Sequence, residues 1–310
     1  MTMAPLVSVV IPLYNKRETI VRAIVSVLDQ GLEAIEVIVV DDGSTDGSAS
    51  KLAEIADPRV RLVSQANAGP GRARNVGAAE ARASLLTFLD ADDEWLPGFL
   101  AAGLAALEHN PDAVAYASGC DTGAFADFYP NHVAYLTPVA QLLAPPSQEM
   151  TPSDLLHYLN GLHSSSTIVR SDIFRRFGGF YDVTRCLWGE DSYLWVLVLF
   201  AGPIYWEPSP RVLFHVADSS LGFAVTRRTM ERPLSSQTDA MLASVPATHR
   251  AAFRKLAKAL ASEDARDLMD TGLVGRAFSL RIRHGIPLLR AIAGDMRRCL
   301  GITLRRRRAG

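Results

Sequence analysis

Short apolar segments alternate with amphipathic ones over the first 120 residues of this 310-residue chain. Several of the apolar segments, such as LVSVVIP and EVIVV, are rich in β-branched residues, which favours buried strands. The segments between them place apolar residues at helical spacing, as in Ile20, Ala23, Ile24, Val27 and Leu28. This pattern predicts an α/β fold, a Rossmann-like, mostly parallel sheet with helices on both faces.

The predicted elements follow one another closely. We expect strands over 6–12, 36–40, 60–63, 85–89 and 113–117, and helices over 47–56, 72–82 and 97–109. Asn15 is expected to cap a further helix that ends near Leu28, and Pro97 suits a first helical turn. The apolar run 194–206 is interrupted by Gly202 and Pro203 and is too short to span a bilayer, so it predicts a buried helix and then a strand.

Composition excludes several classes of protein. Hydrophobic residues make up 48% of the chain, which is enough for a core and argues against wholesale disorder. The three cysteines, Cys120, Cys186 and Cys299, form no CxxC pair, so neither a disulfide framework nor a cysteine-built zinc site is expected. The first ten residues contain no basic segment or cleavage-like site typical of a signal peptide. These features favour a cytoplasmic location.

Acidic residues gather where the predicted strands end. DDGSTDG (41–47) follows the second strand and DADD (90–93) follows the fourth. Ligands bind at the carboxyl ends of the strands in open parallel sheets. Either cluster alone fits turn and capping chemistry. Two clusters at one sheet edge favour a divalent cation and a polar ligand, because buried carboxylates need a cation or hydrogen-bond donors.

Several ordered motifs resemble those of family 2 glycosyltransferases with the GT-A fold. They are VSVVIPLYN, VVDDGSTDGS, NAGPGRARNVG, FLDADDEWLP, GGFYD, WGEDSYLW and LFHVADSS, and they extend over about residues 5–220. The resemblance implies a GT-A domain over 1–220, with a nucleotide-binding half at about 1–118 and an acceptor half at about 119–220. Residues 221–310 fall outside it and are expected to form a helical, basic extension.

The resemblance also assigns a nucleotide-sugar donor to residues at the strand ends. Pro12 and Tyr14 would contact the base and ribose, and the Tyr14 ring offers a face for stacking. Asp42, with Asp41 beside it, would accept a hydrogen bond from the pyrimidine or the ribose. Arg74 would lie near the nucleotide and pair with its phosphates.

Asp90-Ala91-Asp92 resembles the family's Asp-x-Asp signature. The implied cofactor is Mn²⁺ or Mg²⁺, which would bridge the two phosphates and neutralise the charge of the leaving group. Asp92 is expected to ligate the metal and Asp90 to face the ribose or sugar, so that both belong to the donor and metal sites. His215, after an apolar strand, is a further candidate metal ligand.

Glu190 and Asp191 resemble the acidic pair that contains the family's catalytic base. A direct displacement at the anomeric carbon needs a carboxylate that takes the proton of the acceptor hydroxyl. Asp191 is the expected base and Glu190 the second candidate. The alternative is that both acids only occupy the first turn of a helix, where negative charge is favoured.

The predicted function is an inverting glycosyltransferase that moves one sugar from a nucleoside-diphosphate sugar, most simply a UDP-sugar. The expected acceptor is a glycan or a lipid-linked molecule in surface polysaccharide or glycoconjugate synthesis. One alternative is a sugar-1-phosphate nucleotidyltransferase, which is disfavoured because PLYNK follows the first strand where a glycine-rich phosphate loop would be needed. The other is a non-catalytic nucleotide-sugar binding protein, against which the complete acidic set argues.

The C-terminal tail is strongly basic. Residues 273–310 include ten arginines and one acid, a net charge of +9, so that the preceding 272 residues have a net charge of −10. Such a tail is attracted to anionic membrane surfaces, and Leu288, Leu289, Ile292 and Met296 have the spacing of one helical face. The tail is therefore expected either to contact the inner face of the membrane peripherally or to form a helix docked on the domain. Nucleic acid is not an expected partner, because no aromatic residues lie among the arginines from Gly285 onward.

Overall fold

Four parallel strands form the N-terminal half of the sheet. The structure is a computed structural model and describes residues 4–121, 136–218 and 230–288. Strands β1 (Val7–Leu13), β2 (Ile35–Asp41), β3 (Val60–Ser64) and β4 (Leu85–Phe88) lie in the order β3-β2-β1-β4. Every residue of β2 and β4 is buried, as expected for apolar strands covered on both faces. The predicted parallel α/β arrangement is confirmed for this half.

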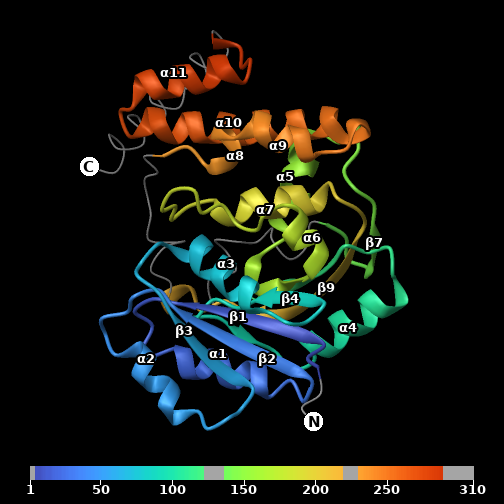
Figure 1. The fold of residues 1–310 in the computed structure, drawn as a ribbon. Helices are drawn as coiled ribbons and strands as arrows, with labels where there is room; N and C mark the ends of the chain where they lie inside the picture. Colours follow the sequence, from blue (N-terminus) through green and yellow to red (C-terminus); the bar gives the residue numbers. More distant parts are fainter. Residues whose placement is uncertain (1–3, 122–135, 219–229, 289–310) are drawn as a thin grey trace, which may run out of the picture.

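Helices cover both faces of this sheet (Figure 1). Helices α1 (Ile20–Leu28) and α4 (Phe99–His109) share one apolar cluster with alternate residues of β1, such as Val9 and Ile11. Helices α3 (Pro70–Glu80) and α7 (Glu190–Leu199) pack on the opposite face, where Val10 of β1 points. The alternation of side chains along the strand thus divides the core into two layers.

Two predicted helices begin later than expected, and a third is shorter. Asn15 does not cap α1, because its Oδ1 accepts a hydrogen bond from the backbone N–H of Thr45, and α1 begins at Ile20. Pro97 lies before α4, because the preceding residue, Leu96, still pairs with the neighbouring strand through its backbone N–H. The helix predicted over 47–56 is shorter. It comprises α2 (Ser48–Lys51) and a 3₁₀ turn (Leu52–Glu54) with no buried residue.

The second half of the sheet is mixed. Strand β8 (Thr167–Arg170) lies antiparallel between β4 and β6 (Ala115–Asp121). Strand β9 (Ile204–Leu213) runs parallel to β6. The short strands β5 (Glu94–Trp95) and β7 (Gln141–Leu143) pair antiparallel with β9. The apolar run 194–206 contributes the end of α7 and the start of β9, as predicted.

The remaining helices form a layer above α7 (Figure 1). They are α5 (Pro152–Asn160), α8 (Pro233–Ser236), α9 (Thr238–Ser244), α10 (Arg250–Asp270) and α11 (Val274–Arg283), whereas α6 (Ser171–Arg176) lies between α7 and the sheet. The Phe253 ring of α10 meets the Phe200 ring edge-on at a centroid distance of 5.8 Å, within the apolar cluster that also covers the sheet. The predicted helical character of the C-terminal region is confirmed for residues 230–288.

The basic end of the tail lies outside the described residues, as do Leu289, Ile292 and Met296. The predicted contact of this tail with membranes therefore stays a prediction. Among the helices of the described ranges, none combines the length and the apolar character needed to cross a bilayer.

Candidate active site

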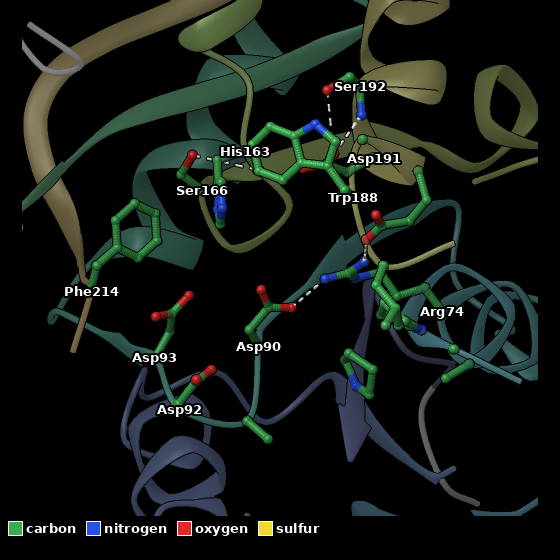
Figure 2. Close-up of a pocket in the computed structure, with 18 of the residues that line it drawn as sticks. Arg74, Asp90, Asp92, Asp93, His163, Ser166, Trp188, Asp191, Ser192 and Phe214 are labelled. Carbon is green, nitrogen blue, oxygen red and sulfur yellow. Dashed lines mark hydrogen bonds and ion pairs between the residues drawn. The ribbon is translucent and has the colours of Figure 1, made fainter. Parts of the chain in front are cut away.

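A cavity of about 550 Å³ lies at the carboxyl ends of β1, β2 and β4. Its walls come from the loops after these strands, the start of α3, the 3₁₀ turn before β8 and the first turn of α7 (Figure 2). All predicted site residues except Asp41 line it, namely Pro12, Tyr14, Asp42, Arg74, Asp90, Asp92, Glu190, Asp191 and His215. The sequence motifs therefore converge on one site, as the sheet topology requires.

One end of the cavity is formed by the ends of β1 and β2. Pro12 lines the wall, and the Tyr14 side chain is 43% exposed, so its ring is accessible to a planar ligand. Asp41 is buried outside the cavity, where its Oδ1 accepts a hydrogen bond of 3.0 Å from the backbone N–H of Ser44. Of the two adjacent acids, Asp42 alone lines the cavity.

Asp42 fixes the loop that leads into α3. Its Oδ1 accepts hydrogen bonds from Gln65 Nε2 at 2.7 Å and from the backbone N–H of Ala68 at 2.8 Å. Its Oδ2 accepts the backbone N–H of Gly69 at 2.8 Å. These donors hold the carboxylate at the cavity wall.

Arg74 bridges the two acidic motifs (Figure 2). Its guanidinium donates to Asp90 Oδ1 at 2.6 Å and to Glu190 Oε1 at 3.0 Å, and it lies over the Phe180 ring at 5.2 Å. Burial alone would lower the pKa of Arg74, but the charges of Asp90 and Glu190 raise it. Burial likewise opposes the charge of Asp90, yet Arg74 holds the pKa of that carboxyl below its ordinary value. Both groups therefore stay ionised in a buried site.

The other two acids of the DADD loop have different partners. Asp92 Oδ2 lies 2.7 Å from Lys16 Nζ, and Asp93 Oδ2 accepts a hydrogen bond of 2.6 Å from Ser165 Oγ. Burial, with Asp90 next, raises the pKa of Asp92, while Lys16 lowers it. Burial raises the pKa of Asp93 well above its ordinary value, and the nearby acids add to this. Through its hydrogen bond with Ser165, Asp93 thus supports the loop that contains Asp90 and Asp92.

The acidic pair at the start of α7 is split between two environments. The Glu190 side chain is buried and bound to Arg74, and burial, with Asp191 next, raises the pKa of Glu190 to about 7. Asp191 is partly exposed and lines the cavity, where its Oδ1 accepts the backbone N–H of Ser192 at 2.7 Å. Within the described parts of the chain, Asp191 forms no ion pair within 4.0 Å, so its outer oxygen is open to a ligand.

The candidate metal ligands fit a divalent cation in part. Asp90 and Asp92 offer the hard carboxylate oxygens that Mg²⁺ uses together with substrate phosphates. His215 lines the same cavity, but its Nε2 hydrogen-bonds with Glu94 Oε2 at 3.1 Å. No three His, Cys, Asp or Glu side chains in the described ranges form a group that could hold a metal. A metal here would therefore rely on Asp90, Asp92 and oxygens of the bound donor.

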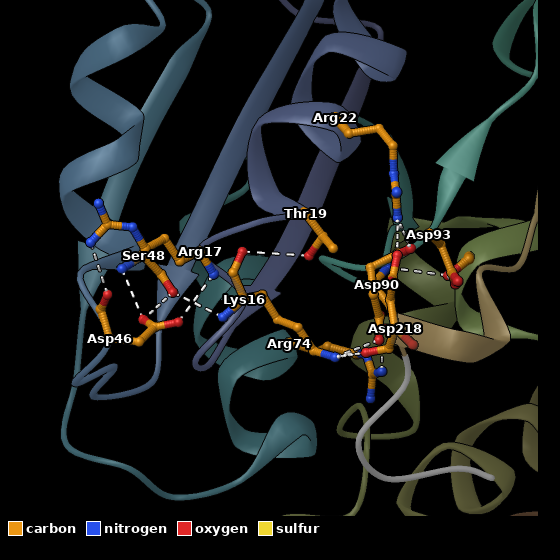
Figure 3. Close-up of polar contacts among 12 residues, drawn as sticks. Lys16, Arg17, Thr19, Arg22, Asp46, Ser48, Arg74, Asp90, Asp93 and Asp218 are labelled. Carbon is orange, nitrogen blue, oxygen red and sulfur yellow. Dashed lines mark hydrogen bonds and ion pairs between the residues drawn. The ribbon is translucent and has the colours of Figure 1, made fainter.

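Three residues in or beside the site were given no individual role in the sequence analysis. Lys16 Nζ donates to the backbone oxygen of Asp218 at 2.6 Å, besides its contact with Asp92 (Figure 3). Arg22 donates to Asp218 Oδ2 at 2.9 Å and to the backbone oxygen of Asp92 at 2.8 Å. His163 lines the cavity from the turn before β8. The signal for Lys16 was its place directly after PLYN at a strand end, whereas Arg22 and His163 had none beyond their proximity to motifs.

Comparisons with known proteins agree with this geometry. The model of the family described as "Glycosyl transferase family 2" matches residues 8–177, more than half of the chain. The succinoglycan biosynthesis protein ExoO of Rhizobium meliloti is 48% identical over 94 residues, which are 30% of this chain and 27% of that protein. The uncharacterized glycosyltransferase EpsJ of Bacillus subtilis is 43% identical over 93 residues, 29% of this chain and 27% of that protein. The matched segments thus span less than a third of these relatives.

The fold matches that of a solved glycosyltransferase structure. Residues 1–349 of S. aureus TarS, in complex with UDP-GlcNAc, superpose with a TM-score of 0.61 over 86% of this chain and 73% of that chain. Sequence identity is 17%, so this likeness shows the GT-A fold. The strand-end motifs, the cavity and the family match over residues 8–177 lead to one conclusion. The chain belongs to glycosyl transferase family 2.

Proposed function

We propose that this chain is an inverting glycosyltransferase that moves one sugar from a UDP-sugar to a hydroxyl of a glycan or lipid-linked acceptor. One observation supports this most directly: the carboxylate of Asp191 lines the cavity without an ion-pair partner among the described residues, whereas the adjacent Glu190 is bound to Arg74. A general base must reach the proton that it takes, and Asp191 meets this condition better than Glu190.

In the proposed reaction the acceptor hydroxyl attacks the anomeric carbon while Asp191 takes its proton. The bond from that carbon to the diphosphate oxygen breaks in the same step, and its electron pair leaves with the nucleoside diphosphate. One displacement inverts the configuration and needs no protein nucleophile. Lys16 and Arg74 supply positive charge beside Asp92 and Asp90, where the diphosphate would lie.

The donor and the acceptor class rest on the similar proteins. The solved TarS structure contains UDP-GlcNAc, which supports a UDP-sugar donor for this chain. ExoO is a succinoglycan biosynthesis protein, which supports an acceptor in surface polysaccharide synthesis. The family match also favours sugar transfer over the nucleotidyltransferase alternative. Peripheral contact of the basic tail with the membrane would place the enzyme near lipid-linked acceptors.

A donor screen tests the proposal. Nucleoside-diphosphate release from a panel of nucleotide sugars should be fastest for one UDP-sugar in the presence of Mn²⁺ and an extract-derived acceptor mixture. Release of pyrophosphate from a nucleoside triphosphate and a sugar-1-phosphate would instead indicate a nucleotidyltransferase. Binding of a nucleotide sugar without turnover under every condition would indicate a binding protein.

Metal dependence of donor binding is a separate prediction. Asp90 and Asp92 provide carboxylates, and the described part of the chain groups no third such ligand with them, so a divalent cation would bind together with the diphosphate. Bound there, Mn²⁺ or Mg²⁺ would stabilise the charge of the leaving group. Calorimetry with UDP should show tight binding in Mn²⁺ and weak binding in EDTA. Equal affinity in both would show that Lys16 and Arg74 alone bind the diphosphate.

A further inference from the structure

His163 has a fixed orientation in the cavity wall. It precedes the 3₁₀ turn Ser164–Ser166, and its Nδ1 accepts a hydrogen bond of 3.2 Å from the backbone N–H of Ser165. The Phe214 ring meets the imidazole at a centroid distance of 4.5 Å and an interplanar angle of 63°. A ring nitrogen that accepts a hydrogen bond bears no proton, so in the neutral imidazole the proton lies on Nε2.

The imidazole faces the acidic part of the cavity. Figure 2 shows His163 between Asp90 and Asp93 on one side and Trp188 and Asp191 on the other. Burial lowers the pKa of His163, although the nearby charges of Asp90 and Asp191 raise it, so the neutral form is favoured. No residue in the described ranges accepts a hydrogen bond from Nε2. The ring therefore presents an N–H donor to the cavity.

The transferred sugar needs such a donor. It must lie between the diphosphate end of the site, at Asp90 and Asp92, and the proposed base Asp191. Ionised carboxylates only accept hydrogen bonds, so they satisfy the hydrogens of sugar hydroxyls but not their oxygens. Two of the cations that line the cavity, Lys16 and Arg74, already donate to Asp92, Asp90 and Glu190.

We propose that Nε2–H of His163 donates a hydrogen bond to a hydroxyl of the sugar that is transferred, and that His163 thereby selects the donor sugar. The inference rests on the proposed glycosyltransferase function. His163 would then be a donor-site residue that lies in the predicted acceptor half of the chain and outside all of the recognised motifs.

Two substitutions of His163 test the roles of its two ring nitrogens separately. His163→Asn retains an oxygen near the position of Nδ1, which can accept the Ser165 N–H as asparagine does at helix N-caps, but it removes the Nε2 donor. His163→Gln retains a donor near the position of Nε2 and removes the cap. His109→Asn is the matched control, because His109 is exposed on α4 and its Nδ1 hydrogen-bonds Ala105 O.

Calorimetry with UDP, UDP-glucose and UDP-GlcNAc is the measurement. His163→Asn should weaken binding of the preferred UDP-sugar about tenfold, the effect of one hydrogen bond, and leave UDP binding unchanged. His163→Gln should recover most of the loss, and His109→Asn should show none. Equal weakening for UDP and UDP-sugar, no weakening, or a change confined to the acceptor KM would each overturn the inference. Failure of the wild-type chain to bind any nucleotide sugar would instead refute the proposed function.

Discussion

At the scale of single residues, Glu190 is bound to Arg74, whereas the adjacent Asp191 is the proposed base. Asp191→Asn keeps the size of the side chain but removes the base, so transfer should fall about 10²- to 10⁴-fold while UDP affinity stays nearly constant. Initial rates and calorimetry measure the two quantities. Asp172→Asn is a suitable control, because Asp172 is an exposed acid in the first turn of α6. Similar small effects of both variants would support the alternative that Asp191 only stabilises a helix start.

Glu190 should make stability depend on pH. Burial raises its pKa from the ordinary 4.5 to about 7 in the folded chain. Because the folded pKa is the higher one, its contribution to stability is fully present below about pH 4.5 and is lost as pH rises through about 7. Urea unfolding should therefore show wild type gaining stability relative to Glu190→Gln from pH 8 to pH 5. Parallel pH profiles of the two chains would contradict the shift.

Most of the site residues predicted from the sequence line the cavity, but their pairings were not predicted. Pro12, Asp42, Asp90 and Asp191 were predictable because each belongs to a short motif with a fixed place at a strand or helix end. The ion pair of Lys16 with Asp92 and the bridge from Arg74 to Glu190 were not, because they join residues 76 and 116 positions apart. Such contacts depend on how the loops pack, which local patterns do not encode.

At the scale of elements, α3 places Arg74 by packing unusually close to its neighbours. A Cβ on Gly71 would lie 2.5 Å from the backbone oxygen of Tyr181 and 3.1 Å from Glu190 Cγ. Gly71→Ala should therefore push the start of α3 away from the acidic pair. We expect transfer to fall, with a loss of stability of about 1–3 kcal/mol from overpacking.

A glycine in the same position of another helix provides the control for Gly71→Ala. Gly275 is likewise the second residue of its helix, α11, and a Cβ there would meet nothing within 4 Å. Gly275→Ala should raise the unfolding free energy by about 0.5–1 kcal/mol, because alanine favours the helix. Urea unfolding measures both variants. Stabilisation by both substitutions would show that α3 can move without cost.

At this scale, elements were predictable where they were continuously apolar. The strands β1, β2 and β4 were recognised because the buried parallel half of a sheet reads as continuous apolar segments. The strand β8 was not, because its residues, TIVR, begin and end with polar side chains and form no continuous apolar segment. The two-residue β5 and the three-residue β7 exist as strands only through pairing with β9, so no local pattern marks them.

At the scale of the whole molecule, a buried ion pair within the helical layer supports the loop before the acidic pair. Arg232 is 6% exposed, and its Nε donates to Asp264 Oδ1 of α10 at 2.8 Å. Its guanidinium lies over the Trp188 ring at 5.8 Å, and its Cγ would lie 2.8 Å from a Cβ on Gly189. Trp188 and Gly189 line the cavity directly before the acidic pair. Helices beyond the family match at 8–177 thus support the loop that contains the proposed base.

Arg232→Met should therefore lower both stability and transfer. Removing one partner of a buried ion pair costs about 3–5 kcal/mol, because the remaining charge, here Asp264, stays buried without its cation. Arg283→Met is the matched control. Arg283 is 45% exposed and lies 3.0 Å from Glu231, and such surface pairs are worth about 0–1 kcal/mol. Urea unfolding should separate the two variants clearly.

Acrylamide quenching should also increase in Arg232→Met alone, because Trp188 is the tryptophan that is not fully buried. If Arg232→Met unfolds like Arg283→Met and leaves Trp188 quenching unchanged, the helical layer does not hold the loop before Asp191.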